Sequence, residues 1–210
     1  MKVAVVGGTG SFGQAVAKRL VDAGVEIVIG SRDAERAREA AATLGGEGRR
    51  AEGANNDDAV RGVDLVLFAV KADAAVDTAR DLRQSIGSTP VLSVCAELVF
   101  GPGGVKPTPE ATSIAKRIQD ELDAPVAAGL HSLAASNLAE APPEEDAFVC
   151  GDDAEAKELA LDLAGRLVSG RAVDCGPLAS ARALEGMTAV IVNVNKRYKA
   201  HAGLRVTGLE

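Results

Sequence analysis

The chain has 210 residues, of which 47% are hydrophobic and 25% are charged, as in an ordinary water-soluble folded protein. Its net charge of -7 and its aromatic content of only 2% argue against a nucleic-acid binder or a membrane-surface protein. No apolar run approaches the ~18 residues of a membrane span. The three cysteines lie far apart without metal-binding spacing, so we expect reduced thiols in a cytoplasmic protein.

Short aliphatic strands alternate with helices along most of the chain. The expected strands are 2–8, 25–30, 64–70, 90–96 and 124–131. The expected helices are 11–24, 33–45, 57–63, 72–86 and 109–122. This alternation predicts an α/β fold with a Rossmann-type doubly wound parallel sheet and helices on both faces.

Two segments interrupt this pattern. Residues 45–53 are rich in glycine and arginine and predict a loop that ends in a short strand. Residues 99–109 contain three glycines and three prolines, which predict an irregular connection or a mobile loop over a site.

The last third of the chain predicts a strand, a turn and a helix over 147–168, a short strand over 171–176 and a long helix over 180–201. Asp152 and Asp153 are interpreted as the start of a helix and not as metal ligands, because no His or Cys cluster accompanies them. Residues 188–194, TAVIVNV, are apolar nearly all round. We therefore expect this helix to be buried against the main domain or a second subunit, and we predict a homodimer.

The first strand is followed by a glycine-rich turn. GTGSFG fits the pattern G-x-G-x-x-G, follows a strand and opens a helix. Gly8 would permit the tight turn, Gly10 the approach of a pyrophosphate, and Gly13 close packing of helix on strand. The expected dinucleotide-binding residues of the turn are Gly8, Thr9, Gly10, Ser11, Phe12 and Gly13.

The second strand ends in Ser31 and Arg32 at the position where a protein that binds NAD places an acid. Arg36 lies on the same helix face, four residues on. A guanidinium binds a phosphate through two parallel hydrogen bonds, and the serine hydroxyl adds a donor. These residues predict NADP(H) as the ligand, with Asp33 capping the following helix.

Residues that could react with a nicotinamide are scarce. There is no Tyr-x-x-x-Lys pair, and no catalytic residue is assigned. His131 ends an apolar strand at the sheet edge where ligands bind, although such a histidine is more often structural. A basic cluster near the C-terminus is either a solvated helix end or a surface for an anionic ligand; it consists of Lys196, Arg197, Lys199 and Arg205.

Several stretches in order along the chain resemble the F420-dependent NADP oxidoreductases. They are GGTGSFGQAVAKRLVDAG, IVIGSRDAERA, AAGLHSL, VCGDDAEAK, DCGPLASARALE and NVNKRYKAHAGLRVTGL. The resemblance implies a reductase that transfers a hydride between NADP(H) and the deazaflavin coenzyme F420. It also implies an NADP-binding domain over 1–145 and a small C-terminal α/β domain over 146–210 that completes the deazaflavin cleft and contributes a dimer contact.

By position, the resemblance places Thr9, Ser31, Arg32 and Arg36 on the NADP phosphates. It places Val70 near the nicotinamide, and His131 and Leu133 at the deazaflavin. Lys71 departs from the family pattern, which has a proline there, and residues 94–109 also differ from it.

Two alternatives remain open at this point. One is an NADP-dependent reductase of a small imine or ketone, in which His131 would donate a proton. The other is a non-catalytic NADP-binding sensor. The absence of an acid–base pair favours the deazaflavin reaction, because two cofactors carry the chemistry and the protein supplies orientation.

Overall fold

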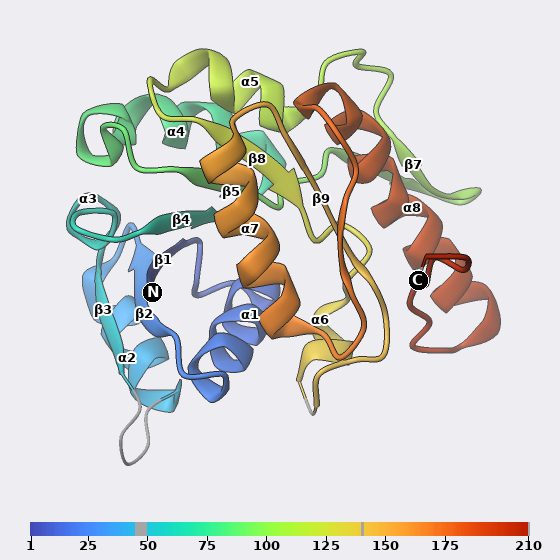
Figure 1. Ribbon diagram of the computed structural model, residues 1–210, viewed down its shortest axis with the longest axis horizontal. Coiled ribbons are helices and arrows are strands. Elements are labelled where there is room, and N and C mark those ends of the chain that lie inside the picture. Colours follow the sequence, from blue (N-terminus) through green and yellow to red (C-terminus); the bar gives the residue numbers. More distant parts are fainter. Residues whose placement is uncertain (45–49, 140, 210) are drawn as a thin grey trace.

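The computed structural model describes residues 1–44, 50–139 and 141–209, and places an eight-stranded sheet between two layers of helices (Figure 1). The strands are β1 Lys2–Val6, β2 Glu26–Ser31, β3 Ala51–Asn55, β4 Leu65–Phe68, β5 Val91–Ser93, β6 Leu98–Gly101, β7 Gly104–Pro107, β8 Val126–Gly129, β9 Ala147–Gly151 and β10 Ala172–Asp174. The α-helices are α1 Ser11–Asp22, α2 Ala34–Leu44, α3 Asn56–Ala59, α4 Ala72–Ile86, α5 Ile114–Glu121, α6 Ala135–Leu138, α7 Ala154–Leu167 and α8 Ala181–Tyr198.

The strand order is β10-β9-β8-β5-β4-β1-β2-β3, which confirms the predicted doubly wound α/β fold. Strand β1 pairs in parallel with both β2 and β4. Strands β2 and β3 are added on one side of β1, and β4 and β5 on the other, so the strand order reverses at β1. In such sheets, ligands bind beyond the carboxyl ends of the strands at this switch point. The topology therefore predicts a binding site at the ends of β1 and β4.

Alternating side chains of the strands build two apolar cores. In β1, Val3 and Val5 face the layer of α1, α2 and α7, whereas Ala4 and Val6 face α4, α5 and α8. Successive residues of a strand point to opposite faces, so a strand covered on both sides must be apolar throughout. This explains the continuous aliphatic runs of the sequence.

The segment after residue 146 continues the sheet. Strand β9 pairs with β8 in antiparallel fashion, and β10 pairs with β9 in parallel. The sheet is therefore parallel except at the β8–β9 pair. The division of the chain at residue 145 stays a prediction.

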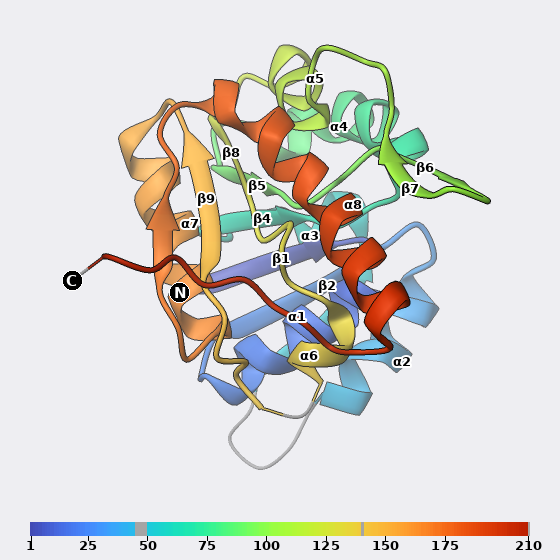
Figure 2. The same cartoon turned by 90° about the vertical axis from the view of Figure 1, so that its right-hand side faces the viewer.

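The expectation of irregular structure over 99–109 is wrong, because β6 and β7 form an antiparallel hairpin. Its prolines avoid the ladder interior: Pro102 lies in the turn and Pro107 at the end of β7. Gly104 provides the positive φ of +104° that the turn requires. The hairpin lies beside α8 (Figure 2), where the Asn193 side chain accepts from Val105 N–H at 2.8 Å and donates to Val105 C=O at 2.7 Å.

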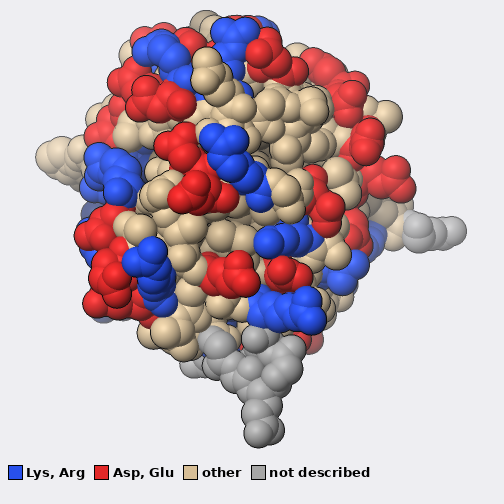
Figure 3. Space-filling view, turned by 90° about the vertical axis from the view of Figure 1, so that its left-hand side faces the viewer, with Lys and Arg blue, Asp and Glu red and all other residues tan. Residues whose placement is uncertain are grey.

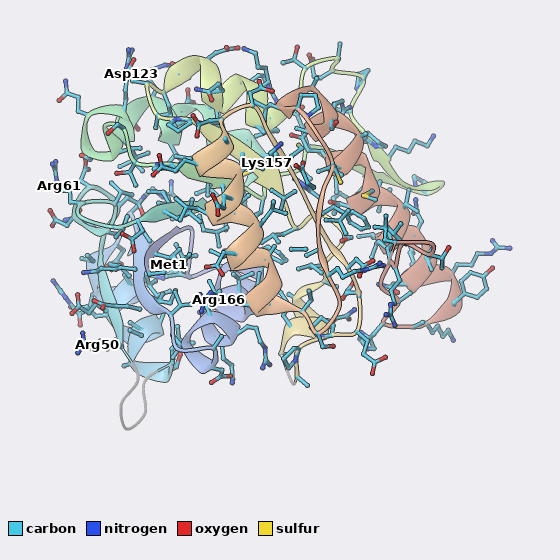
Figure 4. All side chains as sticks on the ribbon, in the orientation of Figure 1. Met1, Arg50, Arg61, Asp123, Lys157 and Arg166 are labelled. Atoms are coloured by element: carbon cyan, nitrogen blue, oxygen red, sulfur yellow. The ribbon has the colours of Figure 1, made fainter. Side chains whose placement is uncertain are left out.

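The predicted loop over 45–53 lies partly outside the described residues, and its end forms β3. On the face shown in Figure 3, basic and acidic side chains alternate. Labelled side chains such as Arg61 and Asp123 lie at the outer edge of the molecule (Figure 4). Arg83 donates to both carboxylate oxygens of Asp123 at 2.9 and 2.7 Å. Because such exposed pairs contribute about 0–1 kcal/mol, the two apolar cores dominate stability.

Candidate functional site

The glycine turn connects β1 to α1 and packs against the end of β4. Gly7 has a φ of +83°, and a Cβ added there would lie 2.6 Å from Ala69 O. Gly7 therefore permits both the left-handed conformation and the close approach of the two strand ends. Gly7 was not among the residues predicted from the sequence, although the paired glycines at the end of the strand were the available signal.

The glycines of the motif have different neighbours. A Cβ at Gly8 would lie 2.8 Å from Val5 O, and one at Gly13 would lie 2.7 Å from Gly7 O. These two residues allow close packing, and only Gly10 and Thr9 of the motif line the adjacent cavity. Phe12 lines a second, larger cavity, and Ser11 lines neither of the two.

The first cavity has a volume of about 370 Å³ and extends from the glycine turn to the end of β2. Ser31, Arg32 and Arg36 line it together, as expected from the sequence. Both guanidinium groups are exposed and make no hydrogen bond or ion pair with another described residue. This end of the cavity therefore presents two free cations.

Two side chains fix the backbone of the segment that carries these residues. Asp33 Oδ1 accepts from Glu35 N–H at 3.0 Å and from Arg36 N–H at 3.3 Å, which confirms Asp33 as the cap of α2. Ser31 Oγ accepts from Asp33 N–H at 3.2 Å. Its own hydroxyl proton is therefore free to be donated to a ligand.

Helices α3 and α4 supply lining residues that the sequence analysis missed, namely Asn56, Ala74 and Thr78. Asn56 Oδ1 is buried and has no hydrogen-bond partner among the described residues. Its position directly after β3, at the ligand-binding edge of the sheet, was the available signal.

The second cavity has a volume of about 590 Å³ and lies between the end of β8, the β6–β7 hairpin and α8. Phe12, His131 and Leu133 line it, so the two residues expected at the deazaflavin lie together. Phe100 of the hairpin also lines this cavity although 71% of its surface is exposed. An exposed aromatic ring at the mouth of an apolar cavity is suited to contact a planar ligand.

His131 is held in one tautomer. Its Nε2 lies 3.1 Å from Cys95 O, and a carbonyl oxygen only accepts, so Nε2 carries the proton. Burial lowers the pKa of His131 to about 4, and Nδ1 has no partner among the described residues. Thr188 of α8 donates to His131 O at 3.0 Å. At neutral pH His131 is therefore an uncharged, fixed wall of the cavity.

The backbone just before His131 is strained. Leu130 is a fully buried non-glycine residue with a φ of +65°. Such conformations cost about 1–3 kcal/mol and cluster at functional sites.

The two cavities meet at the segment after β4. Ala69, Val70 and Lys71 line both of them. Val70, which was expected near a nicotinamide, thus lies at the junction. Ligands bound in the two cavities would face each other across this segment.

Other candidate residues lie outside these cavities. The four residues of the C-terminal basic cluster line neither cavity. Asp153 caps α7, since Oδ1 accepts from Ala156 N–H at 2.9 Å, and Asp152 Oδ1 accepts from Leu178 N–H at 2.9 Å. Within the described ranges, no group of three His, Cys, Asp or Glu residues could hold a metal ion. Over the same ranges, no helix is long and apolar enough to cross a membrane.

The fold defines a protein of the Rossmann-type dinucleotide-binding class, with a second cavity next to the one at the glycine turn. The profile of the family described as NADP oxidoreductase coenzyme F420-dependent matches residues 2–97. An F420-dependent NADP reductase of Methanothermobacter thermautotrophicus is 35% identical, with 100% of this chain and 96% of the relative aligned. That of Methanocaldococcus jannaschii is 34% identical, with both chains fully aligned.

These similarities show that the chain belongs to the family of F420-dependent NADP reductases. A crystal structure of a candidate F420-dependent NADP reductase from Arthrobacter sp. FB24 has the same fold, with a TM-score of 0.83 and 24% identity over 99% of each chain. The resemblance stated from the sequence is therefore confirmed for the family.

Proposed function

We propose that the protein is an oxidoreductase that transfers a hydride between NADP(H) and coenzyme F420. The observation that carries the proposal is the junction of the two cavities at residues 69–71. Direct hydride transfer requires two planar rings in contact, with water excluded from between them. Family membership supports the same pair of ligands.

NADP would occupy the cavity next to the glycine turn. The free N–H groups and the positive dipole end of α1 suit its diphosphate. The guanidinium groups of Arg32 and Arg36, which have no partner among the described residues, suit the 2′-phosphate, and the Ser31 hydroxyl adds a donor. Val70 would then contact the nicotinamide half.

The deazaflavin would occupy the cavity lined by Phe12, His131 and Leu133. These side chains offer apolar contact and one fixed, uncharged imidazole. When bound, the deazaflavin supplies the carbon that accepts or gives the hydride, and the protein orients it. Since none of these residues needs to move a proton, the scarcity of acid–base residues fits this reaction.

The reductase of a small imine or ketone fits the site less well. That reaction needs a proton donor beside the substrate. His131 is neutral above its lowered pKa, and its N–H is already donated to Cys95 O.

The assembly and the location of the protein belong to the same proposal. We infer a homodimer in which α8 contributes to the interface, because Val190 in its apolar stretch is 55% exposed. We also infer a cytoplasmic protein. A molar mass from light scattering equal to that of one chain would contradict the dimer.

The reaction is tested by mixing the protein with NADPH and oxidised F420 and following the absorbance of the deazaflavin. Rapid bleaching with NADPH, and slower bleaching with NADH, is the expected result. NADPH that binds without any bleaching would contradict the proposed reaction.

A further inference from the structure

Lys71 is a cation at the junction of the two cavities, and the hydride transfer itself does not require it. It is the residue before α4, and it lines both cavities. Its side chain is exposed and makes no hydrogen bond or ion pair with any described residue. The ammonium group is therefore available to a ligand on either side.

The surroundings of Lys71 suit an anion. The first turn of α4 has no side-chain cap at residue 71, so its N–H groups add a positive dipole end. Gly10 and Thr9, at the start of α1, line the same smaller cavity. On the side of the larger cavity, Asp73 and Glu97 are the acidic lining residues, and Glu97 is already paired with Arg117 at 3.0 Å.

We propose that Lys71 binds a phosphate group of a bound cofactor where the two cavities meet. A lysine binds phosphate as a point charge, and a free ammonium beside two helix N-termini is the arrangement that phosphates favour. Two sources offer this chemistry: the diphosphate of NADP and the phosphodiester of F420. The inference rests on the proposed function, because that function supplies both ligands.

The test is calorimetric binding of each ligand to the wild-type protein and to Lys71→Met. The ligands are NADP, oxidised F420, adenosine 2′-monophosphate, which lacks the diphosphate, and a deazaflavin core without its phosphate. Lys71→Met should raise the Kd of one phosphate-bearing cofactor about tenfold and leave the two fragments unchanged. Which cofactor is weakened identifies the source of the phosphate.

Two further variants sharpen the result. Lys71→Arg keeps the charge and should restore most of the affinity. Lys18→Met removes an exposed lysine of α1 that pairs with Asp22 and lines neither cavity, so it should change no Kd. The weakening should also shrink in 1 M salt, where the screening length is about 3 Å.

Unchanged affinity of Lys71→Met for both cofactors would overturn the inference, as would equal losses for the fragments. Neither result would contradict the proposed function, because the proposed function is tested separately by the bleaching of F420 with NADPH. A wild-type protein that binds NADP but neither binds nor bleaches F420 would instead overturn the proposed function.

Discussion

At the scale of single residues, the proposed selection of NADP over NAD rests on charge. Arg32 and Arg36 stand where a carboxylate would repel a 2′-phosphate, and neither has a partner within the described chain. Both arginines were predictable from the sequence, because the end of the strand, the serine and the arginines follow one another closely along the chain. For Gly7 and Asn56 the sequence gives only a position after a strand, and their roles depend on contacts made through the tertiary fold, at Ala69 and at the cavity wall.

Replacing Arg32 with alanine should weaken NADP binding about 10–100-fold, since a hydrogen bond to a charged group contributes about 1.5–3 kcal/mol. NAD binding should hardly change, because NAD has no 2′-phosphate. Calorimetric titration of both nucleotides measures the ratio. Arg38→Ala is the matched control, because Arg38 is an exposed arginine of the following helix α2 that pairs with Glu35 and lines neither cavity. An unchanged ratio in Arg32→Ala would refute the assigned role.

At the scale of elements, two buried titratable groups lie near α8, namely His131, which follows β8, and Glu185 of α8 itself. Burial lowers the pKa of His131 to about 4, whereas burial raises the pKa of Glu185 in α8 to about 7. Glu185 is 1% exposed and accepts from Ala115 N–H at 3.2 Å. The two groups therefore link stability to pH in opposite directions.

His131 binds its proton more weakly when folded, so its contribution to stability is lost as pH falls from about 6.5 to about 4. Glu185 holds its proton more tightly when folded, so its contribution is lost as pH rises from about 4.5 to about 7. Each effect amounts to about 3 kcal/mol across its window. Urea unfolding of the wild type and of a variant at each position, between pH 4 and pH 7, measures both effects.

Relative to wild type, Glu185→Gln should become more stable as pH rises, and His131→Gln should become more stable as pH falls. If the free energy of unfolding of both variants changes with pH in parallel with that of the wild type, neither group titrates as described.

The alternation of strands and helices was predictable because it rests on hydrophobic periodicity. The hairpin was not, because its order comes from the Asn193 side chain, 88 residues away from Val105. Likewise, the antiparallel direction of β9 depends on pairing with β8 and leaves no mark in a strand that is buried on both faces.

At the scale of the whole molecule, one sheet joins the two binding regions. Buried Asp146, before β9, accepts from Arg171 Nη2 and from Val206 N–H, both at 2.8 Å. Arg171 holds the pKa of this carboxyl well below its usual range, and Arg171 also donates to Leu209 O at 2.8 Å. These contacts tie the C-terminal tail to the sheet. Independently of them, the segment after β4 forms the shared wall of both cavities.

This arrangement has one direct consequence for the reaction: the hydride should pass between the ligands without exchange with water. The test uses NADPH deuterated at C4, each stereoisomer in turn, with oxidised F420 in ordinary water, and mass spectrometry of the reduced F420. One stereoisomer should deliver its deuterium to the deazaflavin carbon. Reduced F420 that carries only solvent hydrogen from both stereoisomers would contradict direct transfer across the junction at residues 69–71.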